Sequence, residues 1–143
     1  MRRKEDESME QTDIEKLISD FIALRVWAVV GVSQDPAKYG NRIYRSLLAS
    51  GYQVYPVNPK GGEINGATVY PSLADLPQRP EVVDLVVPPA VTEQVVKEAK
   101  SLGLTRVWMQ PGSESETAIA YCRRQGIQVV HDACAMALRR NWD

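Results

Sequence analysis

The residues best suited to chemistry lie where an apolar run gives way to a small polar loop. Residues 26–31 (VWAVVG) end in a glycine, the loop contains Ser33 and Lys38, and Gly40 opens an amphipathic segment. In α/β proteins this arrangement turns backbone N–H groups and the positive end of a helix dipole toward an anion. The spacing therefore predicts a pyrophosphate site made by the Ser33 hydroxyl, the Lys38 ammonium and the amides of residues 39–41.

The same loop departs from the standard nucleotide motifs. In a G-x-G-x-x-G fingerprint the glycine positions would fall on Gly31, Ser33 and Pro36, so that only the first matches. The acidic residue that reads the ribose of NAD is also missing, because the second predicted strand is followed by residues 58–60 (NPK). A lysine at position 60 suits an additional phosphate, and no G-x-x-x-x-G-K-[ST] motif occurs. NAD and P-loop ligands are therefore disfavoured.

A second candidate for chemistry is the segment 131–134 (HDAC). A cysteine three residues after a histidine could pair with it as a nucleophile. However, His131 falls at the end of a predicted strand, Asp132 suits a helix cap, and no oxyanion donor is evident. Zinc-ligand spacing, a nucleophile elbow and a convergent carboxylate pair are also missing from the sequence, which therefore predicts a binding site with no catalytic residues and no metal.

Composition limits the function classes. The chain has 143 residues and a formal net charge of −1, which fits one domain and gives no footprint for nucleic acid. Cys122 and Cys134 lack framework spacing and fit a reducing cytoplasm, and no secretory or membrane-spanning run is found. Residues 1–11 are mostly polar and are expected to be a mobile tail, with one domain over residues 12–143.

Strand-like and helix-like patterns alternate along that domain. The predicted strands are residues 26–31, 53–57, 81–87, 105–109 and 127–130. The predicted helices begin at a capping box at 12–15 (TDIE), cover 40–50 and 91–102, run from a second capping box at 113–116 (SESE) to 125, and end with 134–139. This rhythm predicts a Rossmann-like three-layer α/β/α fold with a mainly parallel five-stranded sheet. Ligands of such sheets bind at the carboxyl ends of the strands.

Five motifs in order resemble the stand-alone CoA-binding-domain family. They are 30–33 (VGVS) with 38–40 (KYG), 55–59 (YPVNP), 84–88 (DLVVP), 108–112 (WMQPG) and 132–134 (DAC), and they span about residues 15 to 140. The fold of this family is similar to the nucleotide-binding domain of the succinyl-CoA synthetase alpha subunit and of ADP-forming acyl-CoA synthetases. The resemblance implies that coenzyme A lies across the carboxyl edge of the sheet.

The resemblance also implies a role for each motif. The pyrophosphate would lie at the first loop, the adenosine near residues 58–60 with the 3′-phosphate at Lys60, the adenine against the third strand exit, and the rest of CoA beside the fourth. The site residues so expected are Gly31, Val32, Ser33, Lys38, Tyr39, Gly40, Asn58, Pro59, Lys60, Val87, Pro88, Gln110 and Gly112.

The expected function is binding of CoA or acyl-CoA without catalysis. The synthetases carry a phosphohistidine in a further domain that 143 residues cannot contain, so His131 is not given that role. The alternatives are an NAD(P)-dependent oxidoreductase, an enzyme that uses Cys134 in thiol exchange, and a subunit or regulatory partner of an acyl-CoA enzyme. A homo-oligomer or another protein partner is compatible with the binding module, whereas nucleic-acid and membrane partners are not expected.

Overall fold

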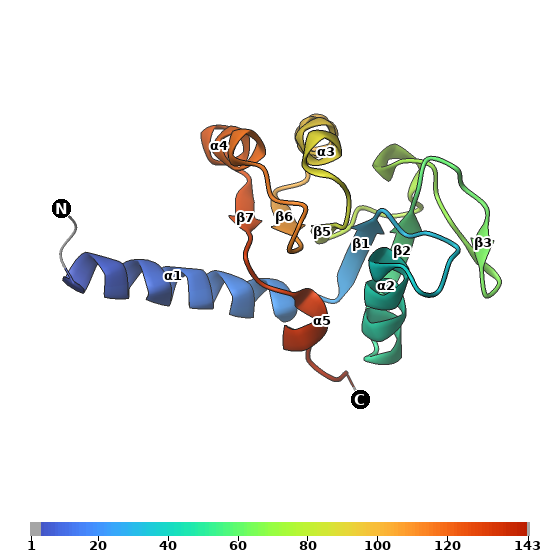
Figure 1. The fold of residues 1–143 in the computed structure, drawn as a ribbon, viewed down its shortest axis with the longest axis horizontal. Helices are drawn as coiled ribbons and strands as arrows, with labels where there is room; N and C mark the ends of the chain where they lie inside the picture. The colour runs from blue at the N-terminus through green and yellow to red at the C-terminus, as the bar shows by residue number, and fades with distance from the viewer. Residues whose placement is uncertain (1–3, 143) are drawn as a thin grey trace.

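The computed structural model describes residues 4–142, and for residues 4–12 it describes the helical backbone alone. Five parallel strands form one sheet in the order β2-β1-β5-β6-β7. They are β1 (Val26–Val30), β2 (Gln53–Val57), β5 (Val82–Leu85), β6 (Arg106–Met109) and β7 (Gln128–Val130). One face carries α1 (Lys4–Ile22), α2 (Tyr39–Ala49) and α5 (Ala135–Leu138), and the other carries α3 (Pro89–Ser101) and α4 (Glu116–Arg124) (Figure 1). The predicted three-layer fold is confirmed.

The strand order decides where a ligand can enter. From β1 the chain moves outward to β2 and then returns to the other side of β1 to form β5. The connections therefore leave β1 and β5 in opposite directions, and a crevice opens at the carboxyl ends of these two strands. The loops that follow β1, β2 and β5 meet at this switch point.

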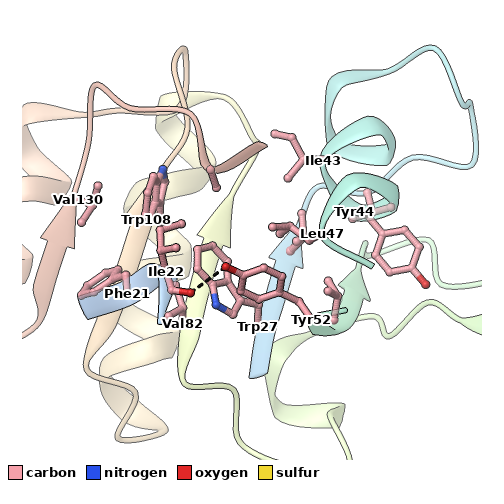
Figure 2. Packing of buried hydrophobic residues seen from close by; sticks show 14 of the residues in the cluster. Phe21, Ile22, Trp27, Ile43, Tyr44, Leu47, Tyr52, Val82, Trp108 and Val130 are labelled. Carbon is pink, nitrogen blue, oxygen red and sulfur yellow. Dashed lines mark hydrogen bonds between the residues drawn. The ribbon is translucent and has the colours of Figure 1, made fainter. Parts of the chain in front are cut away.

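The core beneath α1, α2 and α5 is aromatic (Figure 2). Trp27 of β1 and Trp108 of β6 are both fully buried, with ring centroids 5.7 Å apart. Phe21, at the end of α1, lies 6.3 Å from Trp108, and Tyr52 meets Trp27 edge-on at 5.6 Å. Such tilted and edge-on pairs add to the stabilisation that burial alone provides. These residues join α1 and the start of β2 to the centre of the sheet.

Tyr52 also makes two polar contacts inside this core. Its hydroxyl donates to the Ile22 carbonyl over 2.7 Å (Figure 2) and accepts from the Arg140 backbone N–H over 3.1 Å. Tyr52→Phe keeps the ring and leaves the carbonyl without this partner, so we expect the free energy of unfolding to fall by about 1–3 kcal/mol. Urea unfolding of both proteins measures the loss. An unchanged midpoint would show that the two bonds stabilise nothing.

Several element boundaries differ from the prediction. α1 begins at Lys4, so Thr12 lies inside the helix and the predicted capping box does not start it. Residues 1–3 of the predicted tail lie outside the described residues, and the mobility of residues 4–11 stays a prediction. The helix α4 is capped by Ser115, whose side chain accepts from the Ala118 N–H, two residues after the predicted cap at Ser113.

The residues buried on α3 and α2 also differ in part from the prediction. On α3 the buried residues are Thr92, Val96 and Ala99, whereas Val91 is exposed. Of the inward face that the spacing predicts (Val91, Val95, Ala99 and Leu102), Ala99 is buried and Val95 and Leu102 pack against the core. The buried Thr92 was not predicted, and its hydroxyl donates to the Ser113 carbonyl over 2.7 Å. On α2 the spacing predicts Ile43, Leu47 and Leu48 as the inward face; Ile43 and Leu47 are fully buried, whereas Leu48 is 48% exposed.

A small hairpin was not predicted. Strands β3 (Glu63–Ile64) and β4 (Ala67–Thr68) pair around Asn65 and Gly66, which have φ values of 51° and 83°. Asn-Gly with two positive φ values is typical of a tight hairpin turn, so the dipeptide was a usable signal. The helical turn expected in the following connection is present as the 3₁₀ segment Leu73–Asp75. Within the described chain, none of the helices has the length and apolar character needed to cross a membrane.

Candidate functional site

Two glycines let the backbone close tightly at the switch point. Gly31, which follows β1, has a φ of +100°, and a Cβ there would lie 2.1 Å from the Val86 carbonyl oxygen. A Cβ on Gly40 would lie 2.1 Å from the Gly31 carbonyl oxygen. The exits of β1 and β5 and the first turn of α2 therefore touch through bare backbone. At both glycines the chain itself fills the place that a Cβ would take.

The N-terminus of α2 lacks a side-chain cap. Lys38 is the N-cap residue, its side chain makes no capping bond, and the first turn contains no acidic residue. Backbone N–H groups at a helix start favour an anion when no side chain satisfies them. Lys38 is exposed, and the nearby Ser33 hydroxyl accepts from the Asp35 N–H over 3.0 Å, which leaves its own proton available. This arrangement suits a phosphate group.

The turn after β2 is held against the first loop by Asn58. Its Nδ2 donates to the Val32 carbonyl over 3.1 Å, and its Oδ1 accepts from the Lys60 N–H over 2.9 Å. The Asn58 side chain thus joins two loops, while Pro59 and Lys60 remain exposed at their rim. The Val32 side chain is buried in the core and can offer a ligand only its backbone.

Three predicted site residues line one hollow of about 190 Å³. They are Gly31, Pro59 and Val87, which follow three different strands. Its other lining residues include Ser72, Leu73, Gln94 and Glu98, which the sequence did not single out. The Glu98 carboxylate accepts from the Leu73 N–H over 2.9 Å. The hollow is mainly apolar and has a few polar groups at its rim, as a site for a flat ring would have.

The exit of β6 differs from expectation. Gln110 is fully buried, and its Nε2 donates to Asp84 Oδ1 over 2.7 Å. Its Oε1 accepts from the Ala135 N–H over 3.3 Å, so both polar ends of the buried side chain bond the protein. Gly112 and Pro88 are exposed, and the Gly112 N–H donates to the Glu114 carboxylate over 3.0 Å. This exit offers backbone to a ligand.

The sequence did not reveal that residues of four of its motifs meet in a buried polar cluster behind the loop. Asp84, noted only as a strand residue, is fully buried, and burial raises the pKa of its carboxyl to about 8. The Tyr39 hydroxyl lies 3.0 Å from Cys134 Sγ and 3.4 Å from Gln110 Oε1. Burial, followed by the contact with Cys134, raises the pKa of Tyr39. No local pattern shows that these residues meet, because they come from four separate segments.

The segment 131–134 forms no histidine–cysteine pair. His131 Nδ1 lies 2.5 Å from Asp132 Oδ2, whereas the Cys134 sulfur contacts Tyr39. Residues 4–142 hold no group of three or more His, Cys, Asp or Glu that could bind a metal. A larger hollow of about 490 Å³ lies between α1 and β7, and it contains none of the predicted site residues.

Comparisons with known proteins agree with this geometry. A 43% identical structure, a conserved hypothetical protein of Pyrococcus furiosus, superposes with a TM-score of 0.77 over 80% of this chain and 98% of that one. The apo dinucleotide-forming acetyl-coenzyme A synthetase 1 of Ca. Korarchaeum cryptofilum is 28% identical, with a TM-score of 0.65 over 78% of this chain and 27% of that one.

A curated relative gives the same assignment. The alpha subunit of ADP-forming acetate–CoA ligase I from Pyrococcus furiosus is 40% identical over 83 residues, which are 54% of this chain and 18% of the ligase subunit. This chain thus matches less than a fifth of the ligase subunit. The model of the CoA binding domain matches residues 25–140, nearly the whole chain. The protein therefore belongs to the CoA-binding domain family.

Proposed function

We propose that this protein binds CoA or acyl-CoA at the carboxyl edge of its sheet and has no catalytic activity of its own. The observation that carries the proposal is the hollow formed by Gly31, Pro59 and Val87, in which Gly31 also touches Gly40 of the uncapped first turn of α2. The adenine would occupy the apolar hollow, and the pyrophosphate would bind at the helix start with Lys38. Lys60, on the same rim as Pro59, would bind the 3′-phosphate.

The absence of catalysis is part of the proposal. His131 is paired with Asp132, and Cys134 contacts a tyrosine instead of a base. The matching acetate–CoA ligase subunit is a much longer protein, and the matched region is 18% of it. Action as a subunit or regulatory partner of an acyl-CoA enzyme is compatible with this proposal, because the curated relative is itself an alpha subunit.

Calorimetric titration with CoA, dephospho-CoA, NAD and NADP tests the proposal. We expect CoA to bind more tightly than dephospho-CoA, and NAD to bind weakly, because residues 58–60 offer a lysine where NAD sites have an acid. Binding of NAD without binding of CoA would contradict the proposal and favour an oxidoreductase.

Lys38→Ala tests the pyrophosphate contact. Removing one charge-assisted bond to a phosphate costs about 1.5–3 kcal/mol, so we expect the Kd for CoA to rise by about tenfold or more. The fold should stay intact because Lys38 is exposed. Lys100→Ala, in the last turn of α3 and far from this edge, is the matched control. Equal affinity in both variants would remove Lys38 from the site.

Lys60→Ala tests the 3′-phosphate contact separately. The variant should bind CoA and dephospho-CoA with affinities within about twofold of each other, because the 3′-phosphate then lacks its charged partner. Lys38→Ala should weaken both ligands alike, since both contain the pyrophosphate. If the Lys60→Ala variant still prefers CoA as strongly as the native protein does, another group binds the 3′-phosphate.

A further inference from the structure

A buried polar cluster lies behind the proposed anion site, and the proposed function makes no use of it. We call Asp84, Gln110, Tyr39 and Cys134 the Asp84 cluster. Its contacts run from the Tyr39 hydroxyl to Gln110 Oε1 at 3.4 Å, and from Gln110 Nε2 to Asp84 Oδ1 at 2.7 Å. Cys134 Sγ closes the outer end, 3.0 Å from the Tyr39 hydroxyl. The cluster joins the first residue of α2 to the central strand β5.

Asp84 is the inner end of the cluster, and its surroundings favour a neutral carboxyl. The side chain is fully buried, and Oδ2 has no hydrogen-bond partner among residues 4–142. The neighbouring strands place Val29 and Trp108 beside it. An ionised carboxylate in such a place has no compensating charge, so burial raises the pKa of Asp84 to about 8.

The groups that face Asp84 from the covering helices do not supply that charge. From α2 they are the Tyr39 phenol and, at the solvent side of that phenol, the exposed Arg42. From the start of α5 it is the Cys134 thiol, which is half-buried. The contact that Asp84 does have is with the Gln110 amide, a neutral donor.

The orientation of Gln110 follows from this contact. With Nε2 turned to the Asp84 oxygen, Oε1 faces two donors, the Tyr39 hydroxyl and the Ala135 N–H. Each polar atom of the amide thus meets a complementary partner. The opposite orientation would set the amide nitrogen against both donors, so the acceptor on Asp84 determines which group Tyr39 meets.

Tyr39 connects this cluster to the anion site. It follows the N-cap residue Lys38 and precedes Gly40, whose backbone touches the Gly31 carbonyl. Its ring packs against the aromatic core, and its hydroxyl is held at the far end by the cluster. Movement of this side chain would displace the first turn of α2 relative to the exit of β1.

We propose that Asp84 and Gln110 are positioning residues for anion binding: the Asp84 Oδ1 acceptor orients Gln110, Gln110 holds Tyr39, and Tyr39 fixes the N-terminus of α2. The inference rests on the proposed function for the identity of the anion. A ligand with several negative charges near this helix favours the neutral form of the carboxyl. By linkage, an ionised Asp84 must then weaken the ligand by the same factor.

The first test uses the ligand-free protein, so it does not depend on CoA. Hydrogen exchange of the backbone amides in residues 33–42 should accelerate by about fivefold in Tyr39→Phe, since one net hydrogen bond of about 1 kcal/mol is lost. The control is Tyr55→Phe. Tyr55 lies on β2, and its hydroxyl donates to Gln78 in an exposed contact. Exchange at residues 33–42 that is unchanged in Tyr39→Phe would overturn the inference.

The second test is the pH profile of affinity for desulfo-CoA, which lacks the thiol that would itself titrate. The bound ligand should raise the pKa of Asp84. For each unit of that increase, the affinity of the native protein should fall by about tenfold between pH 7 and 9.5. Asp84→Asn keeps the acceptor for Gln110 and cannot ionise. In this variant the affinity for desulfo-CoA should change by no more than about twofold over the same pH range.

The two tests separate failure of the inference from failure of the proposed function. Identical pH profiles in the native protein and Asp84→Asn would show that ionisation of Asp84 is not coupled to the ligand and would overturn the inference while leaving CoA binding in place. A native protein that binds neither CoA nor desulfo-CoA would overturn the proposed function. In that case the exchange rates of residues 33–42 in Tyr39→Phe decide the inference by themselves.

Discussion

Gly31→Ala is expected to lower the free energy of unfolding by about 4 kcal/mol, from a positive-φ penalty and a steric clash that each cost about 1–3 kcal/mol. Gly31 has a φ of +100°, and the new Cβ would lie 2.1 Å from the Val86 carbonyl oxygen and 2.8 Å from Val87 Cγ1. The carbonyl belongs to backbone, so relief requires the exits of β1 and β5 to separate. Much of the stability of a domain this size would be lost.

Gly126→Ala is the matched control for this prediction. Gly126 also has a positive φ, +74°, but nothing lies within 4 Å of its Cβ position. This variant therefore reports the backbone penalty without the clash. Urea unfolding of the two variants and the native protein isolates the steric part as the difference between them. Equal losses in both variants would show that the contact between the two strand exits relaxes freely.

The second large effect concerns the pH dependence of stability and Asp84. The pKa of this carboxyl is raised from 3.8 to about 8 in the folded protein. Between these values the folded state keeps a proton that the unfolded state has lost. The stabilisation is therefore complete below about pH 4 and is lost as the pH rises toward 8, at about 1.4 kcal/mol for each pH unit. Above that pH both states are ionised and the loss stops.

Asp84→Asn removes this titration. Relative to the native protein, the variant should gain about 4 kcal/mol between pH 5 and pH 8, which is the proton linkage of one group over three pH units. Urea unfolding across this range measures the change. Asp20→Asn, which removes a carboxyl on the exposed side of α1, is the control and should leave the profile parallel to the native one. A parallel profile in Asp84→Asn as well would mean that Asp84 is ionised in the folded state.

The elements of the fold were predictable because their signals are local. The β-branched runs at 26–30, 53–57 and 82–85 are buried strands, and the glycine at 51 ends a helix as expected. The errors also have local causes. The hydrophobic spacing of α3 predicts Val91 on its inward face, but Val91 is exposed and its neighbour Thr92 is buried, with its hydroxyl bonded to the Ser113 carbonyl.

The candidate site was predictable only in part. Gly31, Pro59 and Val87 were predicted as site residues because each follows a predicted strand. The carboxyl ends of parallel strands lie at one edge of the sheet whatever the strand order. Asn58 and Gln110 were chosen as ligand contacts, yet both side chains bond the protein itself. A polar side chain at a strand end can turn outward or inward, and the sequence does not record which partners lie within reach.

By itself the sequence determined a parallel α/β sheet, a loop with Ser33 and Lys38 after its first strand, and a lysine where NAD sites need an acid. These follow from periodicity and residue type, which act along a few neighbouring residues. Only the tertiary structure decided that Asp84, Gln110, Tyr39 and Cys134 meet. Their contact depends on strand order and helix packing, and burial then changes the chemistry of Asp84 in a way that its identity alone does not reveal.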